Sequence, residues 1–162
     1  MQQKHLSFPY QEYDSSEELP ENERDLLKQA KSVLNSAYAP YSKYHVGAAV
    51  LLENGKIYTG NNQENMAFPS GLCAERVALY AAAANNPGIT VRAIAITARS
   101  EAFPVTEPVP PCGSCRQSLI EYEMLSQKRI KVILMGETGK VIVIDGIDHL
   151  LPFSFREDGL KK

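Results

Sequence analysis

The sequence predicts an α/β fold, a three-layer α/β/α sandwich built around a mixed sheet of five strands. Helix-like and strand-like segments interleave along the chain, a pattern that favours helices packed on both faces of one sheet. Two tight turns, at Asn54-Gly55 and at Glu137-Thr138-Gly139, lie between strand-like segments. Because such turns join antiparallel neighbours, we expect a mixed sheet.

The first helix is expected to begin at Glu21, and Pro40 stops it. Its apolar residues recur at helical spacing: Leu26, Leu27, Ala30, Val33, Leu34 and Ala37. Residues 1–20 are polar, with only scattered aromatic rings. We interpret them as an N-terminal extension to a single domain over residues 21–162.

The other expected elements follow from the same hydrophobic periodicity. In chain order they are strands over 46–52 and 56–60, a loop over 61–72, a helix over 73–86, a strand over 91–97, a loop with four prolines over 100–111, a helix over 113–125, and strands over 130–135 and 140–144. The sequence Asn85-Asn86-Pro87-Gly88 is a typical end for the alanine-rich second helix.

The composition favours one globular domain that binds a small ligand. With 162 residues, 44% of them hydrophobic, the chain is long enough to bury a core. Its 17 Lys and Arg against 19 Asp and Glu give a formal net charge of −2. Nucleic-acid-binding domains usually carry a basic face, because contacts to phosphate supply much of their affinity. The basic residues are scattered here, so no nucleic-acid partner is expected.

The sequence also predicts a cytoplasmic location and no membrane partner. No apolar run approaches the roughly 20 residues that span a bilayer. Residues 1–20 lack the basic start and apolar centre of a signal peptide. An odd number of cysteines, three in all, fits a reducing compartment better than a disulfide framework.

Two cysteine motifs predict one zinc ion per chain. Cys73 opens one expected helix, and Cys112 and Cys115 straddle the start of another. A thiol loses its proton more easily at a helix N-terminus, and zinc binds thiolates. Three sulfur ligands leave a fourth position for a water molecule, whose pKa zinc can lower to about 7. We therefore expect Cys73, Cys112 and Cys115 to be the metal ligands.

Glu75 lies two residues after Cys73 and is the expected proton carrier. It can take a proton from the water and pass it to a ring nitrogen and then to a leaving amine. Three thiolates on Zn²⁺ leave a formal charge of −1, and Arg76 and Arg116 are expected to offset it by donating hydrogen bonds to sulfur. The chemistry that these residues favour is hydrolytic deamination of an amidine-like carbon.

Two other interpretations of the cysteines explain less. A redox C-x-x-C pair would leave Cys73 and Glu75 without a role. A structural zinc site usually has four protein ligands, and no fourth cysteine is present. The histidines His5, His45 and His149 stand alone and are expected to be surface or packing residues.

Several short motifs, over about Asp25 to Phe155, resemble the cytidine deaminase family, specifically its small homotetrameric type with three cysteine ligands. They are Tyr38-Ala39-Pro40-Tyr41-Ser42-Lys43-Tyr44, Val46-Gly47-Ala48-Ala49, Gly60-Asn61-Asn62-Gln63-Glu64-Asn65, Cys73-Ala74-Glu75-Arg76, Pro111-Cys112-Gly113-Ser114-Cys115-Arg116-Gln117, and Leu150-Leu151-Pro152 with Phe155. A C-x-x-C pair with a glutamate that is not a ligand marks zinc-dependent base deaminases. The resemblance implies a homotetramer with shared active sites.

The resemblance also implies roles in substrate binding. Asn62 and Glu64 would hydrogen bond the ribose hydroxyl, and the backbone carbonyl of Ala74 would accept from the pyrimidine amine. Tyr44, where the family usually has phenylalanine, would lie against the base. Phe155 would reach the base from a neighbouring subunit. For Tyr44 and Phe155, plain core packing is the alternative.

The implied activity is hydrolysis of cytidine and 2′-deoxycytidine to uridine and 2′-deoxyuridine with release of ammonia, in pyrimidine salvage. Gln63, Met66 and residues 68–72 depart from the family pattern, so a modified cytosine nucleoside or another aminated nucleoside is the alternative substrate. A polynucleotide or tRNA deaminase is disfavoured by the acidic charge and the Asn62-Gln63-Glu64-Asn65 segment. Glu75 argues against a zinc module without enzymatic activity.

Overall fold

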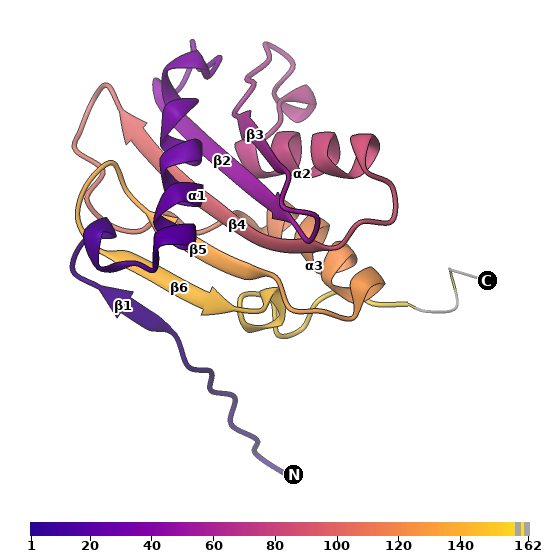
Figure 1. Ribbon diagram of the computed structural model, residues 1–162. Helices are drawn as coiled ribbons and strands as arrows, with labels where there is room; N and C mark the ends of the chain where they lie inside the picture. Colours follow the sequence, from indigo (N-terminus) through magenta and orange to yellow (C-terminus); the bar gives the residue numbers. More distant parts are fainter. Residues whose placement is uncertain (158–159, 161–162) are drawn as a thin grey trace.

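The computed structural model describes residues 1–157 and 160, and over these residues the chain forms a six-stranded mixed sheet between two layers of helices (Figure 1). The helices are α1 (Glu21–Ser32), α2 (Ala74–Asn85) and α3 (Gly113–Ser126). The strands are β1 (Gln11–Tyr13), β2 (Tyr44–Leu52), β3 (Ile57–Asn61), β4 (Val91–Ser100), β5 (Lys131–Met135) and β6 (Val141–Asp145). Within the described residues, no helix is long and apolar enough to cross a membrane.

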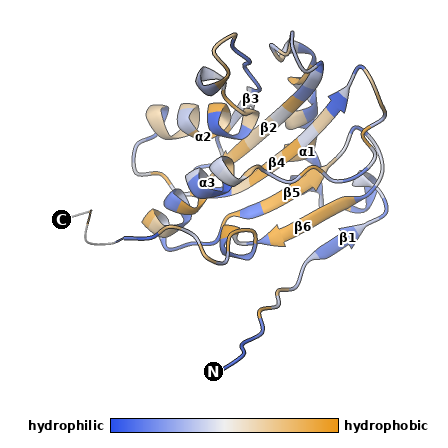
Figure 2. Cartoon of the chain, turned by 180° about the vertical axis from the view of Figure 1, so that it is seen from behind, coloured by the Kyte–Doolittle hydropathy of each residue, from blue (hydrophilic) through white to orange (hydrophobic). Residues whose placement is uncertain are grey.

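The predicted three-layer α/β/α sandwich is confirmed. The strand order is β1-β6-β5-β4-β2-β3, with β4 and β5 parallel and the other neighbours antiparallel. Helix α3 lies in the connection between the two parallel strands, which need a crossover of this kind. α1 covers one face of the sheet, and α2 and α3 cover the other, as the two opposite views show (Figures 1 and 2).

The expected count of five strands was wrong, because residues 11–13 add a sixth. Strand β1 pairs antiparallel with β6 at one edge of the sheet, with Gln11 opposite Val143 and Tyr13 opposite Val141. The Lys140 ammonium also contacts the Glu12 carboxylate. A strand of three largely polar residues has no hydrophobic alternation, so its pairing depends on the edge that it meets and not on its own sequence.

Helix α1 is shorter than the apolar pattern predicted. It ends at Ser32, and a short 3₁₀ turn over Leu34–Ser36 follows it. The side-chain amide of Asn61, at the end of β3, donates a hydrogen bond to the Val33 carbonyl at 3.1 Å. This contact satisfies a carbonyl at the helix end and joins the end of α1 to the strand that leads into the site.

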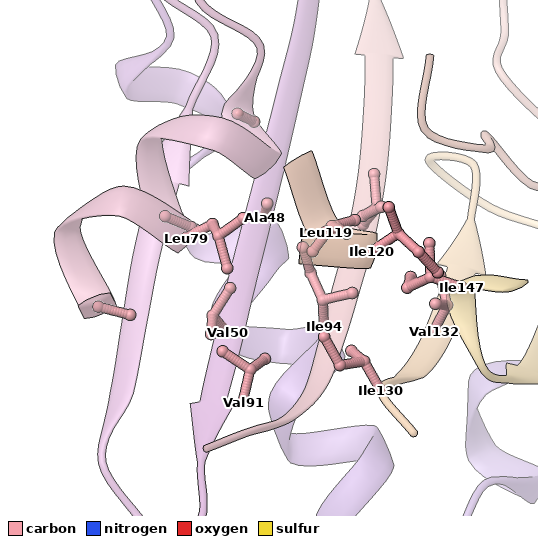
Figure 3. Packing of buried hydrophobic residues seen from close by; sticks show 14 of the residues in the cluster. Ala48, Val50, Leu79, Val91, Ile94, Leu119, Ile120, Ile130, Val132 and Ile147 are labelled. Carbon is pink, nitrogen blue, oxygen red and sulfur yellow. The ribbon is translucent and has the colours of Figure 1, made fainter. Parts of the chain in front are cut away.

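The hydrophobic core has two parts, one on each face of the sheet. Ala48 and Val50 of β2 point to the α2 and α3 side, where Figure 3 shows them near Leu79, Ile94 and Leu119. On the other face the cluster contains Leu26, Leu27 and Ala30 of α1, Ala49 of β2, and Ile133 of β5. The alternation of Ala48, Ala49 and Val50 between the two faces follows from the two-residue period of a strand.

Gly60 allows α2 to lie directly on β3. A Cβ atom at this position would come within 2.5 Å of the Ala78 nitrogen and 2.7 Å of the Ala74 oxygen. Only glycine leaves room for such a close approach of two backbones. The first turn of α2, which carries the residues after Cys73, is thereby fixed against the sheet.

The buried carboxylate of Glu123 joins three elements on the α3 side. Its Oε2 atom accepts hydrogen bonds from the Ile130 amide at 2.8 Å and from the Ile147 amide at 2.9 Å. Ile130 precedes β5, and Ile147 begins the 3₁₀ turn Ile147–His149. The side chain therefore holds α3, the start of β5 and the segment after β6 together.

We expect Glu123→Ala to lower the free energy of unfolding by about 2–3 kcal/mol, because two buried amides lose their acceptor. Glu123→Gln keeps an acceptor oxygen and should lose less. Urea denaturation measures both, with Glu53→Ala as the control, since Glu53 is exposed and forms a surface ion pair with Lys128. A loss no greater than that of the control would contradict this role.

Candidate active site

The three cysteines meet where the N-termini of α2 and α3 approach each other. Cys73 is the N-cap of α2, Cys112 is the N-cap of α3, and Cys115 lies buried in the first turn of α3. The Sγ atoms of Cys73 and Cys112 are 3.8 Å apart, and those of Cys112 and Cys115 are 3.5 Å apart. All three sulfur atoms lie within 4.8 Å of one another.

This cluster fits a zinc ion. With zinc–sulfur bonds of about 2.3 Å in a tetrahedral arrangement, two sulfurs are separated by about 3.8 Å. The cysteine sulfurs stand close to this separation, and three ligands leave one position of the tetrahedron open.

The surroundings favour negative charge on one of the three sulfur atoms, that of Cys73. The pKa of Cys73 is lowered to about 5, chiefly because the Cys115 thiol donates a hydrogen bond to its sulfur, and the Arg76 guanidinium lowers it further against the effect of burial. The same hydrogen bond to Cys73, together with burial, raises the pKa of Cys115. Burial lowers the pKa of Arg76, but its hydrogen bond to Cys73 and the sulfur charges outweigh this and raise it. The Arg76 guanidinium therefore favours the thiolate form of Cys73 at the start of α2.

Glu75 is buried beside the sulfur cluster, with 4% of its surface exposed. Burial raises its pKa, the hydrogen bond from its own amide acts in the opposite direction, and the charge on Cys73 raises it further. A carboxyl group whose pKa is raised holds a proton more readily than an ordinary one, which suits a group that accepts and returns a proton. Glu75 also lines the pocket next to the cysteines.

A pocket of about 870 Å³ opens beside Cys73, Glu75 and Cys112. This volume is typical of sites for small molecules. One part of its wall is apolar, and consists of Tyr44, Val46, Ile96, Val109 and Pro110. The remaining lining residues are Tyr41, Ser42, Asn62, Gln63, Glu64, Asn65, Phe68, Gly71, Leu72 and Arg76. The pocket thus combines the sulfur cluster, a buried carboxyl group, an apolar wall and a polar region.

Asn62 and Glu64, predicted as sugar ligands, both line this pocket and are held firmly by the backbone opposite. The Asn62 side chain donates to the Tyr44 carbonyl at 2.9 Å and accepts from the Val46 amide at 2.8 Å. The Glu64 carboxylate accepts from the Tyr41 amide at 2.8 Å and from the Ser42 amide at 3.3 Å. Their orientations are therefore fixed before any ligand binds.

Of the other two predicted substrate residues of the same subunit, Tyr44 lines the pocket and Ala74 does not. Tyr44 is in the pocket wall, where burial raises the pKa of its hydroxyl. Ala74 is fully buried in the first turn of α2 and is absent from the lining formed by the described residues. Its carbonyl oxygen faces Gly60 of β3. The expected contact between that carbonyl and a substrate amine has no support in this geometry.

Phe155 and Arg116 lie away from the pocket of their own chain. Phe155 is 71% exposed, and its backbone amide and carbonyl bond to the Gln117 side chain at 3.2 and 3.0 Å. Arg116 donates to the carbonyls of Pro111 at 2.7 Å and Leu150 at 2.8 Å. Contrary to the expected hydrogen bond to sulfur, Arg116 therefore holds the loop before Cys112 against the segment after β6.

Ser42 and, apart from Tyr44, the residues of the apolar wall were not predicted as site residues. Ser42 and Tyr41 belong to the Tyr38–Tyr44 motif, which the sequence offered only as a mark of resemblance. Val109 and Pro110 precede Cys112 in a proline-rich loop, and their closeness to a metal ligand was the available signal. Ile96 lies in a buried strand, where its sequence is indistinguishable from plain core.

Comparisons with known proteins agree with this geometry. Residues 20–132 match the family model described as the cytidine and deoxycytidylate deaminase zinc-binding region. A cytidine deaminase of Sporosarcina psychrophila is 37% identical over 135 residues, which are 83% of this chain and 92% of the relative. That of Halalkalibacterium halodurans is also 37% identical, over 83% of this chain and 95% of the relative.

Solved structures give the same result. The crystal structure of the Burkholderia pseudomallei cytidine deaminase matches with a TM-score of 0.71 and 37% identity, over 85% of this chain and 100% of that one. The Mycobacterium tuberculosis cytidine deaminase matches with a TM-score of 0.62 and 28% identity, over 82% of this chain and 96% of that one. The matched region contains the three cysteines and Glu75. This chain belongs to the cytidine and deoxycytidylate deaminase family.

Proposed function

We propose that the protein hydrolyses cytidine and 2′-deoxycytidine to uridine and 2′-deoxyuridine with release of ammonia. The observation that carries the proposal is a buried glutamate beside three converging sulfurs, in the wall of a pocket of about 870 Å³. The relatives named above are cytidine deaminases, which supports cytidine as a substrate. We assign the reaction to pyrimidine salvage in the cytoplasm.

The chemistry divides between a metal and the residues around it. One zinc ion per chain, held by Cys73, Cys112 and Cys115, would supply a Lewis acid that lowers the pKa of a coordinated water to about 7. Glu75 takes the proton from the attacking water and delivers it to the ring nitrogen next to the reacting carbon. It then takes the proton of the hydroxyl group added to that carbon and transfers it to the departing amine, which leaves as ammonia while the carbonyl of the product forms. Arg76 offsets the negative charge of the sulfurs.

The pocket walls would orient the nucleoside. Tyr44 and Val46 offer an apolar surface for the base, next to Glu75 and the cysteines. Asn62 and Glu64 supply polar groups for a sugar hydroxyl. A base without its sugar would leave the remaining hydrogen-bonding positions of these two side chains unfilled, at a cost of roughly 1–3 kcal/mol.

Rates on four compounds test the substrate assignment: cytosine, cytidine, 2′-deoxycytidine and cytidine monophosphate. Free cytosine should react at least roughly ten-fold more slowly in kcat/KM than cytidine, because the remaining hydrogen-bonding positions of Asn62 and Glu64 stay unfilled. The phosphate ester should be poor, because Glu64 places negative charge in the pocket. Equal rates on cytosine and cytidine would contradict the sugar site. Failure on all four with zinc bound would mean that another amine is the substrate, with Phe68 and Leu72 of the pocket lining as the responsible departures.

We further propose a homotetramer in which Phe155 completes the pocket of a neighbouring subunit. Apolar side chains on α2, α3 and the C-terminal segment are exposed in the single chain: Tyr80, Leu125, Phe153 and Phe155. The alanines over residues 81–84 of α2 leave room for close helix packing. Light scattering should give about 72 kDa, four times the chain mass of 17.9 kDa. An active monomer would contradict both the tetramer and the role of Phe155.

A further inference from the structure

The turn that leads into β2 is locked in an unusual backbone conformation. Lys43 has a φ angle of +56°, in the left-handed region that residues other than glycine seldom adopt. Its amide donates to the Ala39 carbonyl at 3.1 Å, and its carbonyl accepts from the Glu101 amide at 3.1 Å. Such a conformation persists only where the surrounding contacts hold it. The residues on either side, Ser42 and Tyr44, both line the pocket.

The Ser42 hydroxyl connects this turn to Glu64. Its Oγ atom accepts a hydrogen bond from the Tyr44 amide at 3.0 Å and donates one to Oε1 of Glu64. A hydroxyl has a single hydrogen to donate, and an ionised carboxylate can only accept. The amide of Tyr44 therefore leaves the Ser42 hydrogen free for Glu64.

The contacts around Glu64 leave its carboxylate a limited capacity for substrate. An ionised carboxylate offers about four acceptor positions. The amides of Tyr41 and Ser42 bond to Oε2, and the Ser42 hydroxyl takes one position on Oε1. One position on Oε1 is left for a hydroxyl of the ligand.

The charge of Glu64 is consistent with this arrangement. Burial raises the pKa of Glu64, but the hydrogen bonds from the Ser42 hydroxyl and from the Tyr41 and Ser42 amides outweigh it, so that the pKa lies below its usual range. The carboxylate therefore stays ionised and acts as an acceptor at neutral pH.

We propose that Ser42 is a positioning residue for sugar recognition, whose hydroxyl turns Oε1 of Glu64 so that its remaining acceptor position meets a hydroxyl of the substrate. The proposal rests on the proposed function, in which Glu64 binds the sugar. Ser42 acts through Glu64, so its removal weakens the binding of a hydroxylated sugar and has little effect on the chemical step.

The test compares cytidine with 2′,3′-dideoxycytidine in wild type, Ser42→Ala and Ser42→Thr. Ser42→Ala should raise KM roughly ten-fold for cytidine, with little change in kcat, and should leave KM for the dideoxy compound unchanged. Ser42→Thr keeps the hydroxyl and should restore most of the difference. Ser32→Ala is the matched control, because Ser32 is an exposed serine whose hydroxyl bonds to the Gln29 carbonyl within α1.

An equal rise in KM for both compounds in Ser42→Ala would overturn the inference, since it would mean a general loss of pocket structure. An unchanged KM for cytidine would overturn it as well. If Ser42→Ala does not fold, Ser42→Cys takes its place, because a thiol has a similar size and is a weak donor; the same outcomes decide.

The experiment distinguishes failure of the proposed function from failure of the inference about Ser42. If wild type does not deaminate cytidine, both are wrong. If wild type deaminates cytidine, and if Glu64→Ala abolishes the preference of the enzyme for cytidine over 2′,3′-dideoxycytidine, the proposed function stands. In that case, an intact preference in Ser42→Ala overturns the role of Ser42 alone.

Discussion

Replacing Glu75 by glutamine is expected to remove nearly all turnover of cytidine while the fold and the bound zinc are kept. Glutamine has the same shape and fills the same buried site, but its amide cannot take a proton from the attacking water. General acid–base groups supply about 10²–10⁴-fold in rate. Glu75 serves two proton transfers in the proposed reaction, so the loss in kcat should reach at least the upper part of this range. The measurement is kcat for cytidine, with zinc content determined on the same sample.

The stability of this variant separates a catalytic role from a structural one. Burial raises the pKa of Glu75, which means that the site disfavours the charged carboxylate. A neutral glutamine should therefore unfold at the same temperature as wild type or a higher one. Glu53→Gln, an exposed glutamate on the surface, is the control and should keep full activity. Turnover near that of wild type in Glu75→Gln would refute the assignment.

The sequence predicted the layers of the fold and the centre of the site for the same physical reason. The centre of the site, the cluster of three cysteine sulfurs, depends on local sequence features, because the start of a helix presents its first residues in a defined direction. The Cys73 and Cys112 motifs each lie at such a start, and the sulfurs converge because α2 and α3 begin at neighbouring places. The interleaved periodicity likewise predicted helices on both faces of the sheet. Short-range sequence patterns were sufficient for both.

Contacts between distant segments could not be predicted in this way. Strand β1 has three residues without hydrophobic alternation, and it forms because the edge of β6 is available. The partners of Glu64 lie 22 and 23 residues away, in a turn that depends on the left-handed conformation of Lys43. Arg116 is next to Cys115 in the sequence, but carbonyls of Pro111 and Leu150 compete for its guanidinium. In each case, tertiary structure decides between several partners that the sequence allows.

Replacing Cys112 by alanine should have the second large effect, on metal content and stability together. Two sulfur ligands remain in the variant. Loss of a residue that only hydrogen bonds to a metal ligand typically lowers metal affinity by about 10–100-fold, so loss of a ligand itself should lower zinc affinity by more than about 100-fold. Because binding energy at such a site also stabilises the fold, the midpoint of thermal unfolding should fall as well. Metal analysis after dialysis against a chelator, with thermal denaturation of the same samples, measures both.

The control and a metal-removal experiment make this prediction decisive. Ser114→Ala changes one of the two residues between Cys112 and Cys115 in the same turn, and should keep zinc and stability. Removing zinc from wild type with a chelator should lower its unfolding temperature to about that of Cys112→Ala, while the chelator should change Cys112→Ala very little. Acid should act like the chelator, because protons compete with the metal for the thiolates. Full zinc content in Cys112→Ala, or an active wild type from which zinc is absent, would show that the three sulfurs do not form the metal site.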